Sequence, residues 1–188
     1  MPDPQDLKKL TLLTAEEMTK ELKQIASQII ERAPESRPLA IVGIETRGVP
    51  LARRLLAEIE KKRANVLSGT LDISLYRDDL DNLGTIPAIK GSDLPFDPEG
   101  CHVVLIDDVL FTGRTIHAAI DALMDYGRPA CIELGVLVDR KNRELPIAPR
   151  YCGVEVNTTR DDYVSVRLEE SDPNDLEGAF LLTPDRST

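Results

Sequence analysis

Residues 103–115, VVLIDDVLFTGRT, contain the residues whose types and spacing most clearly suggest chemistry. They combine two neighbouring carboxylates with a short loop of threonine and glycine. Asp107 and Asp108 follow four apolar residues, and Thr112 and Gly113 precede an apolar pattern of helical spacing. Free N–H groups at a helix N-terminus bind anions, and glycine lets a phosphate approach the backbone. Carboxylates beside that loop would repel a phosphate but accept hydrogen bonds from hydroxyl groups. The segment therefore predicts a sugar-phosphate site, with the phosphate on the loop and ribose hydroxyls on the acids.

Each half of this segment also has a purely structural interpretation. The two aspartates could cap a turn, and Thr112 could cap the following helix. Either feature alone favours that interpretation. The combination within one short segment favours a ligand site.

The elements that position this segment follow from the spacing of apolar residues. Apolar runs predict buried strands at residues 39–44, 67–76, 102–106 and 132–138. Helical spacing predicts helices over residues 14–32, from Pro50 onward, and from about Thr115 to Gly127. This alternation predicts an α/β fold with a twisted, mostly parallel sheet flanked by helices, and such sheets bind ligands at the carboxyl ends of their strands.

The remaining segments are expected to be irregular. Residues 77–100 are acidic and rich in proline and glycine, and they contain a short apolar piece at residues 86–89. Long loops within compact domains are usually functional, so we expect a mobile loop closed by a hairpin. The length of 188 residues fits one domain, residues 1–188, with loosely ordered tails at residues 1–12 and 179–188.

Composition excludes several classes of protein. The formal charge of −10 argues against indiscriminate nucleic-acid binding, and no apolar run reaches the length of a membrane span. The N-terminus lacks the apolar core of a signal peptide. Cys101, Cys131 and Cys152 are far apart and odd in number, which disfavours disulfides and zinc and predicts a cytoplasmic protein. His102 and His117 suggest neither a catalytic triad nor a metal site.

The motifs resemble those of a known enzyme superfamily. Residues 103–115 are similar to the phosphoribosyl-pyrophosphate motif of the type I phosphoribosyltransferases, and residues 43–55, GIETRGVPLARRL, resemble their pyrophosphate loop. Residues 71–80, LDISLYRDDL, and 136–147, VLVDRKNRELPI, resemble narrower motifs of the PyrR family. That family combines uracil phosphoribosyltransferase activity with RNA-binding control of pyrimidine operon transcription. The resemblance extends from about residue 13 to residue 168 and implies the type I phosphoribosyltransferase fold, with a flexible loop or hairpin and a small hood.

The resemblance implies roles for the matched residues. Asp107 and Asp108 would be catalytic together with Arg77, which would meet the leaving pyrophosphate. The residues implied to bind phosphoribosyl pyrophosphate or the nucleotide are Thr46, Arg47, Gly48, Val109, Leu110, Phe111, Thr112, Gly113, Arg114 and Thr115. The residues implied to flank uracil are Val138, Asp139, Arg140 and Val164. Mg²⁺ would be held mainly by the substrate's phosphates, so no protein ligand is assigned to it.

Simpler interpretations of three of these residues stay open. Arg47 could form a surface ion pair, Arg77 could be a solvated loop charge, and Asp139 could be a turn residue. Tyr76 could likewise be a strand residue that packs on the core.

Three functional hypotheses follow from the resemblance. The first is a uracil phosphoribosyltransferase that also binds pyrimidine-operon leader RNA in response to uridine monophosphate; the others are an enzyme that has lost RNA binding and a purine-base phosphoribosyltransferase. The predicted RNA contacts are Lys20, Lys23, Lys141 and Arg143. Ser27 and the Lys141-Asn142 pair depart from the residues expected in RNA-binding members of the family. The implied partners are phosphoribosyl pyrophosphate, uracil, uridine nucleotides and further copies of the chain, as a dimer or larger homo-oligomer.

Overall fold

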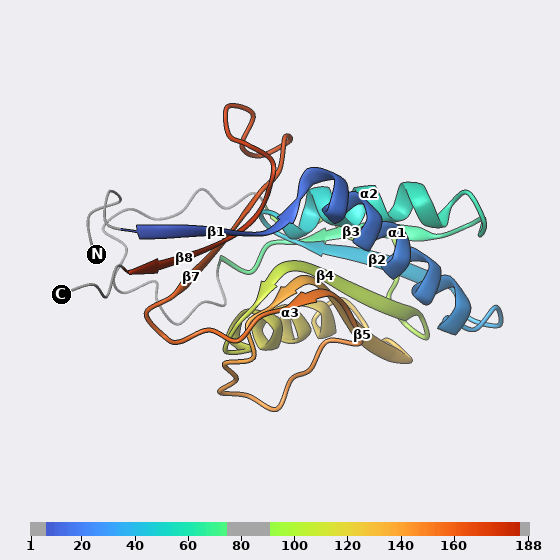
Figure 1. Cartoon of the computed structure of the whole chain (residues 1–188). Helices are drawn as coiled ribbons and strands as arrows, with labels where there is room; N and C mark the ends of the chain where they lie inside the picture. The colour runs from blue at the N-terminus through green and yellow to red at the C-terminus, as the bar shows by residue number, and fades with distance from the viewer. Residues whose placement is uncertain (1–6, 75–90, 185–188) are drawn as a thin grey trace.

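The computed structural model describes residues 7–74 and 91–184, which form two sheets and three helices (Figure 1). The first sheet is parallel, with strand order β3-β2-β4-β5-β6, and the second is antiparallel, with order β1-β8-β7. The strands are β1 (Leu7–Thr14), β2 (Leu39–Ile44), β3 (Leu67–Leu71), β4 (His102–Leu110), β5 (Cys131–Asp139), β6 (Tyr151–Glu155), β7 (Tyr163–Arg167) and β8 (Gly178–Pro184). The helices are α1 (Ala15–Arg32), α2 (Gly48–Ile59) and α3 (Arg114–Met124). The predicted parallel sheet flanked by helices is confirmed.

The parallel sheet is covered on both faces. Helices α1 and α2 pack on one face and α3 on the other (Figure 1). Every residue of β2 is buried, as its continuous apolar run predicts for a strand between two helical layers. Each face has its own apolar core, and the strands between them hold the carboxyl ends of β2, β4 and β5 in register.

Helix α1 begins where the sequence predicts. The Thr14 hydroxyl accepts a hydrogen bond from the Glu17 N–H at 3.3 Å, and the Glu17 carboxylate accepts one from the Thr14 N–H at 2.9 Å. This reciprocal capping box satisfies two backbone donors that the helix itself leaves free. The apolar face of the helix is buried, which confirms the predicted spacing; its buried residues are Met18, Leu22, Ile25, Ala26 and Ile29.

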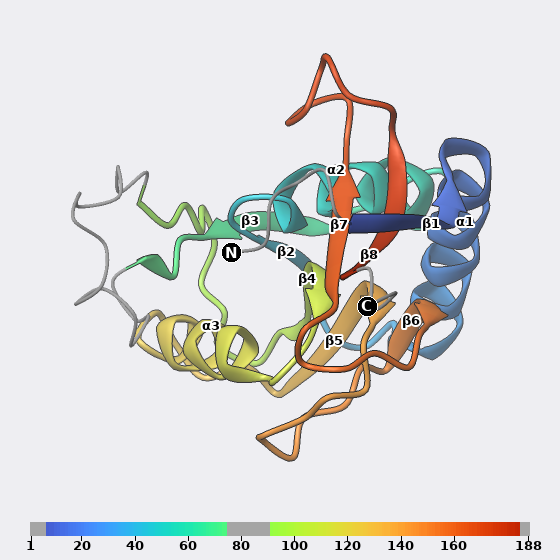
Figure 2. The ribbon, with the colours of Figure 1, turned by 60° about the vertical axis from the view of Figure 1, so that its left-hand side comes forward.

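The prediction of loosely ordered tails is wrong over residues 7–12 and 179–184. These residues form β1 and β8, which pair with each other, and β7 pairs with β8 to complete the antiparallel sheet, here called the hood (Figure 2). Ala179 and Phe180 are buried, and the Lys9 ammonium lies 3.7 Å from the centroid of the Phe180 ring. The two strands come from opposite ends of the chain, so their pairing leaves no local signal in either segment.

Several element boundaries differ from the expected ones. Strand β3 ends at Leu71, whose carbonyl accepts a hydrogen bond from the Glu45 N–H, instead of continuing to Tyr76. Helix α2 begins at Gly48, so Pro50 is its third residue, and α3 ends at Met124, before Gly127. Strand β4 continues to Leu110 and therefore contains both aspartates.

The expected loop at residues 77–100 lies largely outside the described residues, as do Tyr76 and Arg77. Its described end joins the parallel sheet through a bridge between Thr70 and Asp93. Among the described helices, none combines the length and the apolar character needed to cross a membrane.

Candidate active site

The paired aspartates lie in the last part of β4, where the strand leaves the core. Asp107 is buried, with 6% of its surface exposed, and Asp108 is half-buried. Asp107 Oδ1 accepts a hydrogen bond from the Asp108 N–H at 2.9 Å, and Asp108 Oδ1 accepts one from the Val109 N–H at 2.9 Å. Burial raises the pKa of Asp108, while its contact with Asp107 and the positive charge of Arg47 act in the opposite direction. The strand backbone thus holds the two carboxylates at the carboxyl end of β4. In this class of fold, ligands bind at the carboxyl ends of the parallel strands.

The turn after β2 packs directly against these aspartates. A Cβ atom on Gly48 would overlap the Ile106 carbonyl oxygen and lie 3.2 Å from Asp107 Cα. Only glycine allows this approach, so Gly48 holds Thr46 and Arg47 beside the end of β4. The peptide bond between Glu45 and Thr46 is cis.

Arg47 connects this turn to the hood. Its Nη2 donates a hydrogen bond to Asp172 Oδ1 at 2.8 Å, and its Nε donates to Asp172 Oδ2 at 3.3 Å. The hydrogen bond to Asp172 raises the pKa of Arg47, and the charge of Asp108 contributes in the same direction. The structure therefore gives Arg47 an ion pair, as the simpler interpretation expects, but the pair lies near Asp108. No motif or spacing in the sequence indicates that Asp172 belongs to this region.

The loop between β4 and α3 has the geometry of an anion site. Gly113 has φ 96°, in the left-handed region that favours glycine, and α3 begins at the next residue, Arg114. The Thr112 hydroxyl accepts a hydrogen bond from the Arg114 N–H at 3.3 Å. The Thr112 carbonyl accepts hydrogen bonds from the Glu144 N–H at 2.9 Å and the Leu145 N–H at 3.1 Å. The segment at Glu144 and Leu145 thus holds the loop in place through these hydrogen bonds. The first turn of α3 leaves its N–H groups free to bind an anion.

Phe111, in the same loop, stacks against Arg140. The Arg140 guanidinium carbon lies 3.9 Å from the centroid of the Phe111 ring. Arg140 is buried and donates hydrogen bonds to the Thr158 hydroxyl at 3.2 Å, the Thr159 carbonyl at 3.2 Å and the Asp162 carbonyl at 2.6 Å. Burial lowers the pKa of this arginine. Arg140 therefore joins the loop after β4 to the segment between β6 and β7.

Arg143 has a structural role that differs from its predicted contact with RNA phosphates. It donates hydrogen bonds to the carbonyls of Ile147 and Phe111, each at 2.8 Å, and forms a 2.7 Å ion pair with Asp139. Only 20% of its side chain is exposed. Asp139 also accepts a hydrogen bond from the Lys141 N–H at 2.8 Å, as a turn residue would. Arg143 and Asp139 brace the loops on the two sides of the candidate site.

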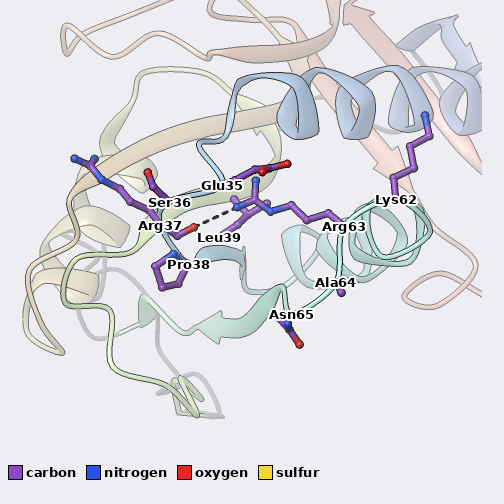
Figure 3. Close-up of a pocket in the computed structure, with 9 residues that line it drawn as sticks. All are labelled: Glu35, Ser36, Arg37, Pro38, Leu39, Lys62, Arg63, Ala64 and Asn65. Atoms are coloured by element: carbon purple, nitrogen blue, oxygen red, sulfur yellow. Dashed lines mark hydrogen bonds between the residues drawn. The ribbon is translucent and has the colours of Figure 1, made fainter.

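A separate pocket of about 600 Å³ lies near Leu39, at the opposite end of β2 (Figure 3). Arg37, Lys62 and Arg63 contribute its positive charge. The Arg63 guanidinium donates hydrogen bonds to the carbonyls of Ala33, Pro34 and Arg37, at 2.9 to 3.2 Å. The Arg63 guanidinium is thus used to bind carbonyl groups at and just after the end of α1. The candidate active site is therefore the carboxyl end of β4 and not this pocket.

Comparison with known proteins identifies the family. The family described as "Phosphoribosyl transferase domain" matches residues 10–171. The "Bifunctional protein PyrR" of Roseiflexus sp. is 48% identical over 172 residues, covering 91% of this chain and 93% of the relative. The protein of the same name from Thermus aquaticus is 49% identical over 170 residues, covering 89% and 93%. The chain belongs to the PyrR family.

Solved structures agree on the fold of this family member. A hypoxanthine phosphoribosyltransferase from Staphylococcus aureus superposes with a TM-score of 0.68 at 23% identity, covering 97% of this chain and 95% of the other. A Trypanosoma cruzi hypoxanthine phosphoribosyltransferase gives a TM-score of 0.70 at 18% identity, covering 97% of each chain. At these identities the likeness shows the type I phosphoribosyltransferase fold and leaves the base open.

The remaining residues implied by the PyrR resemblance fall into different environments. Val138 and Val164 have buried side chains within the core beneath α1 and α2. Lys20 and Lys23 are exposed on α1, and Lys141 forms a 2.8 Å ion pair with Glu155. Strand β4 ends with Val109 and Leu110, just before the loop, and Thr115 is the second residue of α3, just after it. Arg77 lies outside the described residues.

Proposed function

We propose that this PyrR-family chain transfers ribose 5-phosphate from phosphoribosyl pyrophosphate to uracil, giving uridine monophosphate and pyrophosphate. The observation that carries the proposal is the adjacency of Asp107 and Asp108 to the Gly113 loop at the start of α3. The carboxylates would accept hydrogen bonds from the ribose hydroxyls. The 5-phosphate would lie on residues 112–115, and the pyrophosphate would lie near Thr46 and Arg47.

Transfer requires the bond between ribose C1 and pyrophosphate to break as the bond to the uracil nitrogen forms. The protein would hold the sugar and base in line and stabilise charge as it moves onto the leaving pyrophosphate. Arg47 would supply hydrogen-bond donors to that leaving group, and Arg77 is proposed to join it. No side chain needs to bond covalently to the sugar.

Mg²⁺ is proposed to arrive with the substrate's phosphates. Within residues 7–74 and 91–184, no three histidine, cysteine, aspartate or glutamate side chains gather as a ready-made metal site. The half-buried Asp108 offers hard carboxylate oxygens, which suit an ion that keeps most of its ligands from phosphate and water. When bound, the ion would neutralise pyrophosphate charge.

The base is proposed to lie between the loop after β4 and the loop after β5. Arg140 and Asp139 border that region, and the polypeptide backbone at Val138 and Val164 would line it, because both valine side chains are in the core. Uracil is favoured over a purine by the PyrR-like motifs at residues 71–80 and 136–147.

We further propose that the chain regulates pyrimidine genes by binding their leader RNA in a uridine monophosphate-dependent manner. The relatives named as bifunctional support this second role. Lys20, Lys23 and Lys141 are the proposed contacts, and Arg143 is withdrawn because its guanidinium is engaged. The protein is proposed to act in the cytoplasm, consistent with its free cysteines, and as a homo-oligomer.

The decisive experiment measures pyrophosphate release from phosphoribosyl pyrophosphate and Mg²⁺ with a panel of nucleobases. Uracil should support turnover and yield uridine monophosphate. Efficient use of hypoxanthine, guanine or adenine without any use of uracil would overturn the choice of base and leave the transferase assignment intact. No turnover with any base would overturn the enzymatic proposal.

A further inference from the structure

Two arginines attach the segment between β7 and β8, residues 168–177, to the body of the protein. Arg54 of α2 forms ion pairs with Glu170 at 2.6 Å and Glu177 at 2.5 Å. Arg47, in the turn after β2, pairs with Asp172 at 2.8 Å. Arg54 is a residue of helix α2 with no proposed role in substrate binding. Arg47, in contrast, is a residue proposed to bind the substrate's pyrophosphate.

The Asp172 carboxylate is held by its own segment. Its Oδ2 accepts a hydrogen bond from the Leu168 N–H at 3.2 Å, and its backbone N–H donates to the Leu168 carbonyl at 2.7 Å. Leu168 is completely buried. The Asp175 N–H donates to the Asp172 carbonyl at 3.0 Å. The acceptor of Arg47 is therefore fixed to the core through a hydrogen-bonded turn, with only 17% of its side chain exposed.

This pairing fixes the orientation of the Arg47 guanidinium without using all its donors. An arginine has five N–H donors in a rigid plane, and Asp172 accepts from Nε and Nη2, which leaves three for other partners. Asp108 is close enough for its charge to act on Arg47. The three remaining donors therefore belong to a guanidinium that Asp172 holds on one side and that lies near Asp108.

We propose that Asp172 is a positioning residue for phosphoribosyl transfer, which orients Arg47 so that its remaining donors meet the substrate's pyrophosphate. This inference rests on the proposed function. An outer carboxylate that orients an inner ligand-binding side chain reduces the cost of ordering that side chain when the ligand arrives. The competing possibility is that Asp172 occupies Arg47 at the expense of the substrate. In that case its removal would improve binding.

The test is Asp172→Asn, which keeps an acceptor for the Leu168 N–H but removes the charge. The KM for phosphoribosyl pyrophosphate should rise about tenfold, the usual effect of removing a residue that orients a ligand-binding side chain. The KM for uracil should change by less than about twofold. Asp172→Glu, which restores the charge, should recover part of the loss. Because Asp172 acts through Arg47, adding Asp172→Asn to Arg47→Ala should change the KM by less than about twofold.

Glu170→Gln is the matched control, because it breaks an arginine pair of the same segment without touching Arg47. It should leave the KM for phosphoribosyl pyrophosphate unchanged, and circular dichroism melting should show all variants folded. The proposal is overturned by an unchanged or lower KM in Asp172→Asn, by an equal effect in the Arg47→Ala background, or by an equal effect of Glu170→Gln. Calorimetric titration with phosphoribosyl pyrophosphate and Mg²⁺ measures the same differences as Kd values without any base. Failure of uracil as a substrate is therefore distinguishable from failure of Asp172 as a positioning residue.

Discussion

The guanidinium of Arg140 lies over the ring of Phe111, with 3.9 Å between its carbon and the ring centroid. The same guanidinium donates hydrogen bonds to Thr158, Thr159 and Asp162. One buried side chain thus links the proposed phosphate loop after β4 with the segment between β6 and β7. A planar, forked cation can stack and donate in this way, and a lysine ammonium cannot.

Arg140→Lys should therefore weaken the proposed base site more than the phosphate site. The KM for uracil should rise about tenfold, corresponding to about 1.4 kcal/mol, the size of one lost charge-assisted hydrogen bond. Steady-state kinetics with each substrate varied in turn measures the effect. Arg160→Lys is the control at an exposed position of the same segment. A larger rise in the KM for phosphoribosyl pyrophosphate than for uracil would contradict this role.

Asp107→Asn combined with Asp108→Asn should reduce transfer at least about a thousandfold, because both proposed acceptors for the ribose hydroxyls lose their charge. The fold should persist, since asparagine retains an acceptor for the Asp108 and Val109 N–H groups. Uridine monophosphate formation and thermal melting are the measurements. Asp121→Asn, on the exposed surface of α3, is the matched control. Full activity in the double variant would return the aspartates to the role of turn caps.

The sequence predicts those parts of the fold whose causes are local. The Thr14 capping box and the apolar face of α1 depend on residues within a few positions of one another, and β2 is a continuous apolar run. The pairing of β1 with β8 joins the two ends of the chain, and neither strand carries a local pattern strong enough to predict it. Strand β3 is shorter than predicted because the apolar pattern continues past Leu71, where the pairing with β2 ends.

The same distinction holds in the candidate site. Asp107, Asp108 and Gly113 lie within one short segment, and their types and spacing suffice to predict a sugar-phosphate site. Asp172 approaches Arg47 across 125 positions of the chain, so only the folded arrangement shows the pair. The prediction that Arg143 contacts RNA depends on its charge and its place in the PyrR-like motif at residues 136–147. Its bonds to carbonyls in two other loops could not be inferred from spacing.

Glu133 should make stability depend on pH in the acidic range. It accepts hydrogen bonds from Tyr151 at 2.5 Å and from His102 at 3.0 Å, and Arg150 lies 3.5 Å away. Burial acts to raise the pKa of Glu133, but these partners outweigh it and leave the pKa below its usual value. A depressed pKa contributes stability that is present above the unfolded value of about 4.3 and is lost as pH falls through the folded value.

The free energy of unfolding should therefore decline below about pH 4.3 more steeply in the wild type than in Glu133→Gln. Urea denaturation at a series of pH values between neutrality and pH 3 measures both curves. Glu35→Gln, at an exposed position, controls for the removal of one carboxylate. Parallel curves for the wild type and Glu133→Gln would show that this cluster does not couple to folding.

Lys20→Ala combined with Lys23→Ala should weaken binding to the leader RNA of the organism's own pyrimidine genes. Both lysines are exposed on α1, in a chain of net charge −10, so the proposed RNA site is narrow and makes few phosphate contacts. With about two or three contacts, log K should fall with log salt at a slope of only about −2, and the double variant should flatten it further.

Uridine monophosphate should tighten binding if the active site and RNA site are coupled. Filter binding with and without the nucleotide tests this, with Lys61→Ala and Lys62→Ala, in the turn after α2, as the matched pair. Absence of specific binding at low-micromolar protein in both conditions would leave the chain as an enzyme only.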